Sequence, residues 1–177
     1  YNQRQELQKQ LQQSQIRFQK LQSRKSYYWE EFLNLIAVLQ QFNALSDYHP
    51  TPLGQAAATI RSENELWLGL VLMSGYLEEL QPHQLAGLVS AMITEPLRPD
   101  AWISFPQSPE VGQVFEVSNP PQVSLKETRR LLNQCQKRYA LAIPVWLEMR
   151  CVGLVEQWAL GINWYDLFEN TNLDDGD

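Results

Sequence analysis

The sequence contains few of the residues from which catalytic and metal sites are built. Its 177 residues include only two histidines and two cysteines, at His49, His83, Cys135 and Cys151. A structural zinc site takes four such ligands, usually in closely spaced pairs, and these four residues lie far apart. None of the eight glycines is followed by lysine, so the P-loop that cradles nucleotide phosphates is absent. The sequence predicts no catalytic residue, no metal site and no cofactor bound by this chain.

Long apolar runs and an excess of basic residues are absent as well. No apolar run approaches the ~20 residues that cross a bilayer, and the glutamine- and arginine-rich N-terminus does not resemble a signal peptide. The formal net charge is −6, whereas proteins that bind nucleic acid by themselves usually carry a basic excess. Cys135 and Cys151 both fall in apolar helical patterns and are interpreted as buried, reduced thiols. We therefore expect an intracellular protein without a membrane partner, in the cytoplasm or in a plastid.

Residues 1–25 predict a projecting stalk helix. They are rich in glutamine, and a ladder of residues at alternating spacings of four and three runs from them into the next segment. Such a ladder is the seam by which a helix packs against one partner helix. We expect a stalk or half of an antiparallel coiled coil, and a domain-linking helix is the alternative. The rungs are Leu7, Leu11, Phe18, Leu21, Tyr28, Phe32, Leu35 and Leu39, with Ser14 and Lys25 as polar interruptions.

Residues 26–62 predict a helix, a short two-stranded turn and a second helix. From Ser26 onward the apolar stripe widens, as in a helix that faces a core. Pro50 and Pro52 disfavour helix at the residues that precede them, so an extended turn is expected there, and Gly54 opens the next helix. This order is that of a partial winged-helix element with a short β-hairpin, although a plain helical hairpin would show the same periodicity.

Residues 63–177 predict a helical bundle, so that the whole chain is expected to be mainly α. Six of the ten prolines lie within residues 96–123, which predicts a long proline-rich loop. The segment from Pro144 to Gly161 is apolar at nearly every helical angle, so we expect a helix covered on several sides. Helices are also expected at 63–74, 82–95, from Ser124 to about Ala142, and at 164–169. The aromatic side chains expected to hold the core around this segment are Trp146, Trp158 and Trp164.

Four basic residues on the helix that begins at Ser124 form the candidate nucleic-acid-binding site. Spaced at 100° per residue, they gather within about 100° of the helix surface, opposite its apolar face. Basic residues in this arrangement can contact successive phosphates. No aromatic residues, which would stack on bases, interleave with them, and a solvated outer face is the alternative. The four residues are Lys126, Arg129, Arg130 and Lys137.

Three stretches in this order resemble the C-terminal DSHCT region of superkiller-type DExH-box RNA helicases. The first is a G-x-x-A-x-x-I segment at Gly54–Ile60, which precedes an E-L helix at Glu65-Leu66. The second is an L-x-P-x-Q-x-A-x-L-x-S helix at Leu80–Ser90. The third runs from Trp158 to Trp164 and leads into an acidic turn at Asp174–Asp177. The resemblance covers roughly residues 27 to 177.

This resemblance implies a non-catalytic accessory region of an ATP-dependent RNA helicase, which braces the ATPase core and the RNA path. Its partners would be RNA and the helicase's own RecA-like domains, with a further protein partner through the stalk helix. ATP and magnesium would be bound only elsewhere in the parent helicase. Tyr1–Lys25 would be the returning helix of an arch-like insertion, and the helix that contacts RNA would begin after Gly176-Asp177.

Two other functions remain open from the sequence. The ladder of residues on the first helix would suit a helical scaffold or oligomerisation module. The order of helix, hairpin and helix would suit a winged-helix nucleic-acid-binding regulator, against which the acidic net charge counts.

Overall fold

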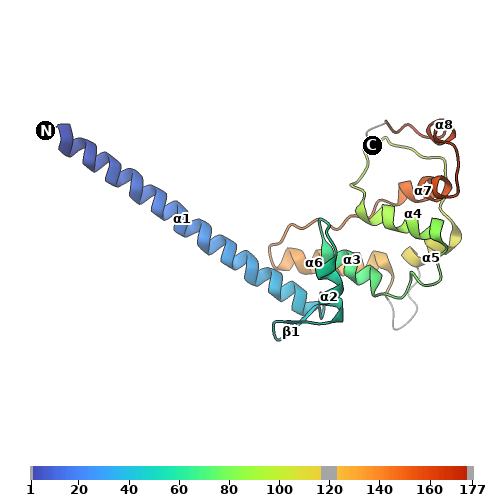
Figure 1. Cartoon of the computed structure of the whole chain (residues 1–177), viewed down its shortest axis with the longest axis horizontal. Coiled ribbons are helices and arrows are strands. Elements are labelled where there is room, and N and C mark those ends of the chain that lie inside the picture. Colours follow the sequence, from blue (N-terminus) through green and yellow to red (C-terminus); the bar gives the residue numbers. More distant parts are fainter. Residues whose placement is uncertain (1, 117–122, 175–177) are drawn as a thin grey trace.

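One long helix, α1 (Asn2–Gln41), projects from a cluster of shorter helices (Figure 1). This computed structural model describes residues 2–116 and 123–174, and over them the chain is mainly helical, as the sequence predicts. The elements after α1 are β1 (Leu45–Ser46), β2 (His49–Pro50), α2 (Pro52–Thr59), α3 (Glu65–Leu72), α4 (Pro82–Ile93), α5 (Pro109–Glu116), α6 (Leu125–Arg138), the 3₁₀ helix η1 (Met149–Cys151), α7 (Val152–Ala159) and α8 (Trp164–Phe168).

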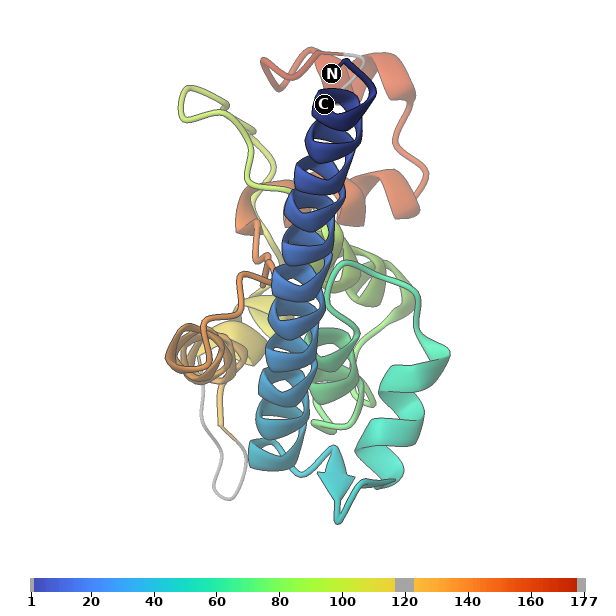
Figure 2. The ribbon, with the colours of Figure 1, turned by 90° about the vertical axis from the view of Figure 1, so that its left-hand side faces the viewer.

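Only the C-terminal turns of α1 belong to the core. The described side chains between Leu11 and Trp29 are all exposed, whereas Leu35, Val38 and Leu39 pack against the other helices. The helix runs unbroken through residues 23–26, where the stalk is expected to meet the domain. Figure 2 shows α2 and α6 on opposite sides of its C-terminal end. The part of α1 from Leu11 to Trp29 is therefore held by its own backbone hydrogen bonds and not by packing.

A tight hairpin follows α1 and confirms the predicted two-stranded turn. The residues between β1 and β2, Asp47 and Tyr48, both have positive φ angles, as a type I′ turn requires. Thr51 caps α2 by accepting a hydrogen bond from the Gly54 N–H, at 3.2 Å. A Cβ atom at Gly54 would lie 2.1 Å from the Ala44 carbonyl oxygen, so only glycine lets α2 approach the hairpin this closely.

The core lies among α3, α4, α5 and α6, with α7 packed against α4. At Gly87, a Cβ atom would lie 2.8 Å from Cγ of Glu156, so the absence of a side chain lets α4 and α7 pack closely. Burial of each large apolar side chain stabilises the fold by about 1.5–3 kcal/mol. The largest fully buried side chains are Trp67, Phe115, Leu88, Leu125 and Leu132.

Helix starts that depend on local capping are where the sequence predicts them. Pro82 is the first residue of α4, and its N-cap Gln81 forms a capping box with Gln84. Ser124 caps α6 by accepting from the N–H of Glu127 at 3.3 Å, and Asn163 caps α8.

The helix expected from Pro144 to Gly161 is wrong over its first part. Residues 141–148 are irregular, and helical structure begins only at η1 and α7. Because side chains distant in sequence satisfy the backbone of this strip, it needs no helical hydrogen bonds to be buried. A short apolar run cannot by itself be assigned to one conformation or the other. The carbonyls of Ile143, Pro144, Val145 and Trp146 accept from the side chains of Gln136, Asn64, Arg129 and Trp67, respectively.

Two of the three tryptophans expected in the core are on the surface. Trp158 and Trp164 are 57% and 55% exposed, so the prediction that they hold the core is wrong. α7 turns Val152 toward α4 and leaves Trp158 on the outer side, because one short helix buries only one face here. Trp146 is partly buried and contributes its carbonyl to the core.

The loop expected over residues 96–123 contains a helix, α5. Pro109 begins α5, and the N–H of Ser108 just before it donates to the Glu156 carboxylate at 2.8 Å. Val111 and Phe115 are fully buried on one side of α5, which explains why this proline-containing segment is helical. Residues 117–122 of the expected loop lie outside the described residues.

Cys135 and Cys151 are both buried thiols, as the sequence predicts. Burial raises the pKa of the Cys135 thiol. Among the described residues, no helix is long and apolar enough to cross a membrane, and no group of three or more histidine, cysteine or acidic side chains is placed to hold a metal ion.

Candidate docking site at the end of α1

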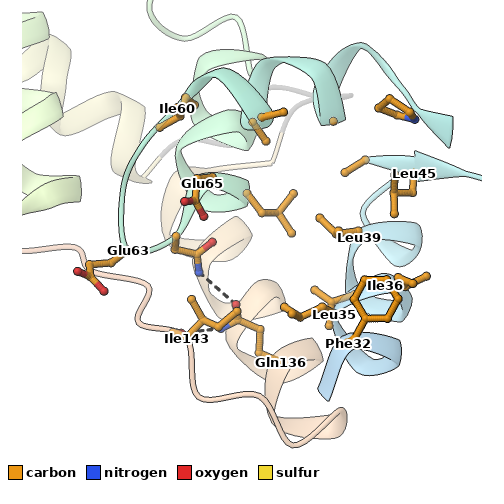
Figure 3. A pocket seen from close by; sticks show the side chains of 18 residues that line it. Phe32, Leu35, Ile36, Leu39, Leu45, Ile60, Glu63, Glu65, Gln136 and Ile143 are labelled. Atoms are coloured by element: carbon orange, nitrogen blue, oxygen red, sulfur yellow. Dashed lines mark hydrogen bonds between the residues drawn. The ribbon is translucent and has the colours of Figure 1, made fainter. Parts of the chain in front are cut away.

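An apolar pocket of about 660 Å³ opens between the end of α1, the hairpin, α2 and α3 (Figure 3). Its α1 wall is made by residues spaced three and four apart, which lie on one face of a helix. The α2 wall is made by small alanine side chains, which leave the space unfilled. The most prominent lining residues are Phe32, Leu35, Ile36, Ala57, Ala58 and Ile60.

The inner end of the pocket is closed by buried amides whose hydrogen bonds are already made. Asn64 Nδ2 donates to Gln136 Oε1 and to the Pro144 carbonyl, both at 3.1 Å, and its Oδ1 accepts from the N–H of Trp67 at 3.0 Å. Gln136 Nε2 donates to the Ile143 carbonyl at 2.8 Å. Because these groups are satisfied within the chain, the pocket offers its occupant mainly apolar surface.

Two exposed carboxylates, Glu63 and Glu65, lie at the edge of the pocket. Figure 3 shows them on the side opposite Phe32 and Ile36. Neither makes a salt bridge within the described part of the chain, although Glu65 lies in the first turn of α3, where the helix dipole favours negative charge. The arrangement suits an occupant with an apolar face and a basic flank.

The four predicted phosphate-binding residues lie on α6. Two of them bond to other parts of the chain, and a third bonds within α6. Lys126 forms an ion pair with Glu116, and Arg130 forms one with Glu127. Arg129 Nε donates to the Val145 carbonyl at 2.7 Å, while Lys137 is exposed in the last turn of α6. The hydrogen bond from Arg130 lowers the pKa of Glu127. Phosphate binding by these residues remains a prediction.

An ion pair between a buried glutamate and a half-exposed arginine, which the sequence analysis missed, holds the loop after α4. Arg150 Nη2 lies 2.7 Å from Oε2 of Glu148, which also accepts from the N–H of Leu97 at 3.0 Å. Arg150 donates as well to the carbonyls of Leu97, at 3.0 Å, and Ala101, at 3.3 Å. Burial alone would raise the pKa of Glu148, but its hydrogen bonds with Arg150 and Leu97 outweigh burial and lower it. The only signal in the sequence is two opposite charges in an apolar run.

The C-terminal described residues are tied to the same loop. Ile103 and Thr171 form an isolated antiparallel bridge, and Asn172 Nδ2 donates to the Asp100 carbonyl at 2.9 Å. Asp174 forms a salt bridge with Arg98 at 3.0 Å. This pairing holds residues 171–174 in place after α8, and no sequence pattern predicts it.

Fold and surface together define a helical domain with a projecting helix and an open apolar pocket. The family model described as the DSHCT (NUC185) domain matches residues 47–177, and the chain belongs to this family. The chain is also 33% identical over 156 residues to the DExH-box ATP-dependent RNA helicase DExH15, chloroplastic, of Arabidopsis thaliana. That match includes 84% of this chain and 13% of the relative, so the chain spans only a small part of the relative's length. The resemblance predicted from the sequence is confirmed.

Proposed function

We propose that this chain is a non-catalytic accessory region of an ATP-dependent RNA helicase that braces the ATPase core and the RNA path. The observation that carries the proposal is the open apolar pocket at the end of α1, in a chain of the DSHCT family. The pocket of about 660 Å³ is open to solvent and lined mainly by apolar side chains, and exposed apolar surface of this kind commonly marks a place where another segment binds.

The occupant we propose is a helix from elsewhere in the parent protein. Its apolar face would cover Phe32 and Ile36, and a basic residue on its flank would meet Glu63 or Glu65. The end of α1, the hairpin and α2 would then form part of a winged-helix element completed by that helix. Each large apolar side chain buried there would contribute about 1.5–3 kcal/mol to the association.

The parent protein's chemistry would lie outside this chain. We propose that ATP and magnesium are bound by RecA-like domains of the parent, and that this chain contributes position and not catalysis. The relative from Arabidopsis thaliana is named as chloroplastic, and a plastid or the cytoplasm is the compartment we propose here.

The test is to fill the pocket in the full-length parent protein. Ala58 is exposed and lines the pocket, so Ala58→Trp should occupy it without disturbing the buried core. Gln55→Trp places the same side chain on α2 outside the pocket and is the matched control. We expect RNA-stimulated ATP hydrolysis to fall at least several-fold for Ala58→Trp and to stay unchanged for the control.

Equal activity of the two variants would contradict the proposal. So would ATP hydrolysis by the purified 177-residue chain, because a non-catalytic region should show none above background.

A helical scaffold is the second candidate, and the exposed ladder on α1 favours it. Leu11, Phe18 and Leu21 are exposed at the spacing of a helix–helix seam. Sedimentation of the chain with and without residues 1–22 distinguishes the two functions. A concentration-dependent dimer that disappears on truncation supports the scaffold.

A further inference from the structure

One sector of α1 combines exposed aromatic rings with basic side chains. Leu21, Tyr28 and Trp29 are 64%, 62% and 60% exposed, and together with Lys25 they line an open hollow of about 600 Å³. At 100° per residue, seven residues between Arg17 and Phe32 fall within a sector of about 120°. We call this sector the aromatic–basic face, and its members are Arg17, Phe18, Leu21, Lys25, Tyr28, Trp29 and Phe32.

The residues of this face do not resemble the seam of an ordinary coiled coil. Such seams consist mostly of leucine, isoleucine and valine, which insert between the side chains of a partner helix. From Ser14 to Phe32, Leu21 is the only aliphatic rung among six, and Lys25 occupies the middle of the ladder. The six ladder positions over this stretch are Ser14, Phe18, Leu21, Lys25, Tyr28 and Phe32.

The charge of the N-terminal segment is opposite to that of the whole chain. Residues 1–25 include six lysines and arginines and one acidic residue, Glu6, which gives a net charge of +5 in a chain of net charge −6. The nearest following carboxylates, Glu30 and Glu31, fall outside the sector when residues are placed at about 100° each. The face is therefore a local positive surface on an acidic protein.

We propose that the aromatic–basic face binds single-stranded RNA. Lys25 and Arg17 would contact phosphates, while bases would stack on Tyr28 and Trp29, which need no particular base because every base has an aromatic face. Arg17 to Trp29 spans about 18 Å of helix, enough for a short run of nucleotides. Stacking and phosphate contacts would serve DNA equally well, so the choice of RNA rests on the proposed function.

Figure 1 shows that α1 projects away from the other helices. Phe32 also lines the pocket of the proposed docking site, whereas the members of the face from Arg17 to Trp29 do not. Trp29 and Phe32 have ring centroids 5.5 Å apart with planes inclined by 33°, and both rings remain accessible. RNA could thus contact α1 while the pocket is occupied.

The experiment measures binding of a fluorescein-labelled 12-nucleotide oligouridine to the 177-residue chain by fluorescence anisotropy, at 50 and 200 mM salt. The double variant Lys25→Glu/Trp29→Ala should bind at least tenfold more weakly and show a shallower salt dependence. The double variant Arg61→Glu/Trp158→Ala reverses one exposed basic residue and removes one exposed ring outside α1, and it should stay within twofold of the unchanged chain. Trp29→Tyr should keep most of the affinity, because it retains a stacking ring.

Circular dichroism of each variant verifies that the helices are intact, which is expected because Lys25 and Trp29 are exposed. Failure of the unchanged chain to bind RNA would overturn the proposal, as would equal binding by the first double variant. Binding of an acidic amphipathic helical peptide to this face without any binding of RNA would also overturn it. No ATPase core is present in this assay, so its failure is distinguishable from failure of the proposed function.

Discussion

Arg150 and Glu148 form a salt bridge of 2.7 Å around which the loop after α4 is organised. The Glu148 carboxylate is buried, and it accepts hydrogen bonds both from Arg150 and from the N–H of Leu97. Arg150 donates to backbone carbonyls of the same loop, those of Leu97 and Arg98. The glutamate thus binds an N–H group of the loop, and the arginine binds its carbonyl groups. Substitution of this pair therefore tests how much the attachment of the loop contributes to the stability of the chain.

Glu148→Gln should destabilise the chain by about 2 kcal/mol, because it removes the charge that partners Arg150 while leaving Arg150 partly buried. Urea unfolding followed by circular dichroism measures the change. Glu127→Gln breaks a similar pair with Arg130 on the surface, where solvent screens the charges, and should have a clearly smaller effect. Equal losses in the two variants would show that burial of the first pair has no energetic consequence.

The same pair predicts a pH dependence of stability. The pKa of Glu148 is lower in the folded chain than its ordinary value, so the unfolded chain takes up the proton first as the pH falls. Its contribution is therefore present above about pH 5 and is lost progressively below it. The difference in unfolding free energy between the unchanged chain and Glu148→Gln should shrink from pH 7 to pH 3. A difference that grows toward low pH would contradict the assigned direction.

Helix starts were predictable because their causes are local. A cap such as Ser124, or a proline at the first helical position such as Pro82, acts on backbone groups within one turn. The irregular strip at 141–148 was not predictable, because its carbonyls are satisfied by Asn64 and Trp67, some 80 residues earlier in the chain. An apolar pattern indicates that a segment is buried, but it does not reveal the distant side chains whose hydrogen bonds allow the segment to be buried without forming a helix.

The docking site was equally hidden from the sequence. Its walls come from Phe32 on α1, Ala58 on α2 and Ile143 after α6, and no motif joins them. Outward placement of Trp158 follows from which side of α7 meets α4, a choice made by the close contact at Gly87. The family resemblance could be predicted because it depends on the order of short motifs and not on packing.

Asn64→Ala should cost about 2–3 kcal/mol, more than loss of an ordinary helix cap. The side chain caps α3 and also donates to Gln136 and to the Pro144 carbonyl, so its removal leaves buried acceptors without donors. Asn163→Ala removes the cap of the short helix α8. The capping hydrogen bond, from the N–H of Tyr165 to the Asn163 side chain, is exposed to solvent, so its loss should cost about 1 kcal/mol or less. Thermal unfolding of the two variants compares these effects, and equal losses would show that the buried network adds nothing to capping.

Substitution of two glycines should have opposite consequences. Gly54→Ala places a Cβ atom 2.1 Å from the Ala44 carbonyl oxygen and should destabilise the chain by about 1–3 kcal/mol, because hairpin and helix must separate. Gly112→Ala meets only the flexible side chain of Gln107, at 3.2 Å, and lies inside α5, where alanine favours helix by up to about 1 kcal/mol. Urea unfolding should therefore separate the variants, and a stable Gly54→Ala chain would contradict the close approach.

Removal of residues 1–22 should leave the unfolding free energy of the remaining domain within about 0.5 kcal/mol of its original value, because changes remote from the core have little effect on stability. The described side chains of α1 from Leu11 to Tyr28 are exposed, whereas its core contacts begin at Leu35 and Val38. Urea unfolding monitored by tryptophan fluorescence suits this test, since all six tryptophans lie after residue 22. The helical signal should fall, because the removed segment is helical but unsupported by packing. If truncation lowers stability by several kcal/mol, or if the melting temperature of the unchanged chain rises with its concentration, α1 is packed against a second copy in solution and not exposed as a free stalk.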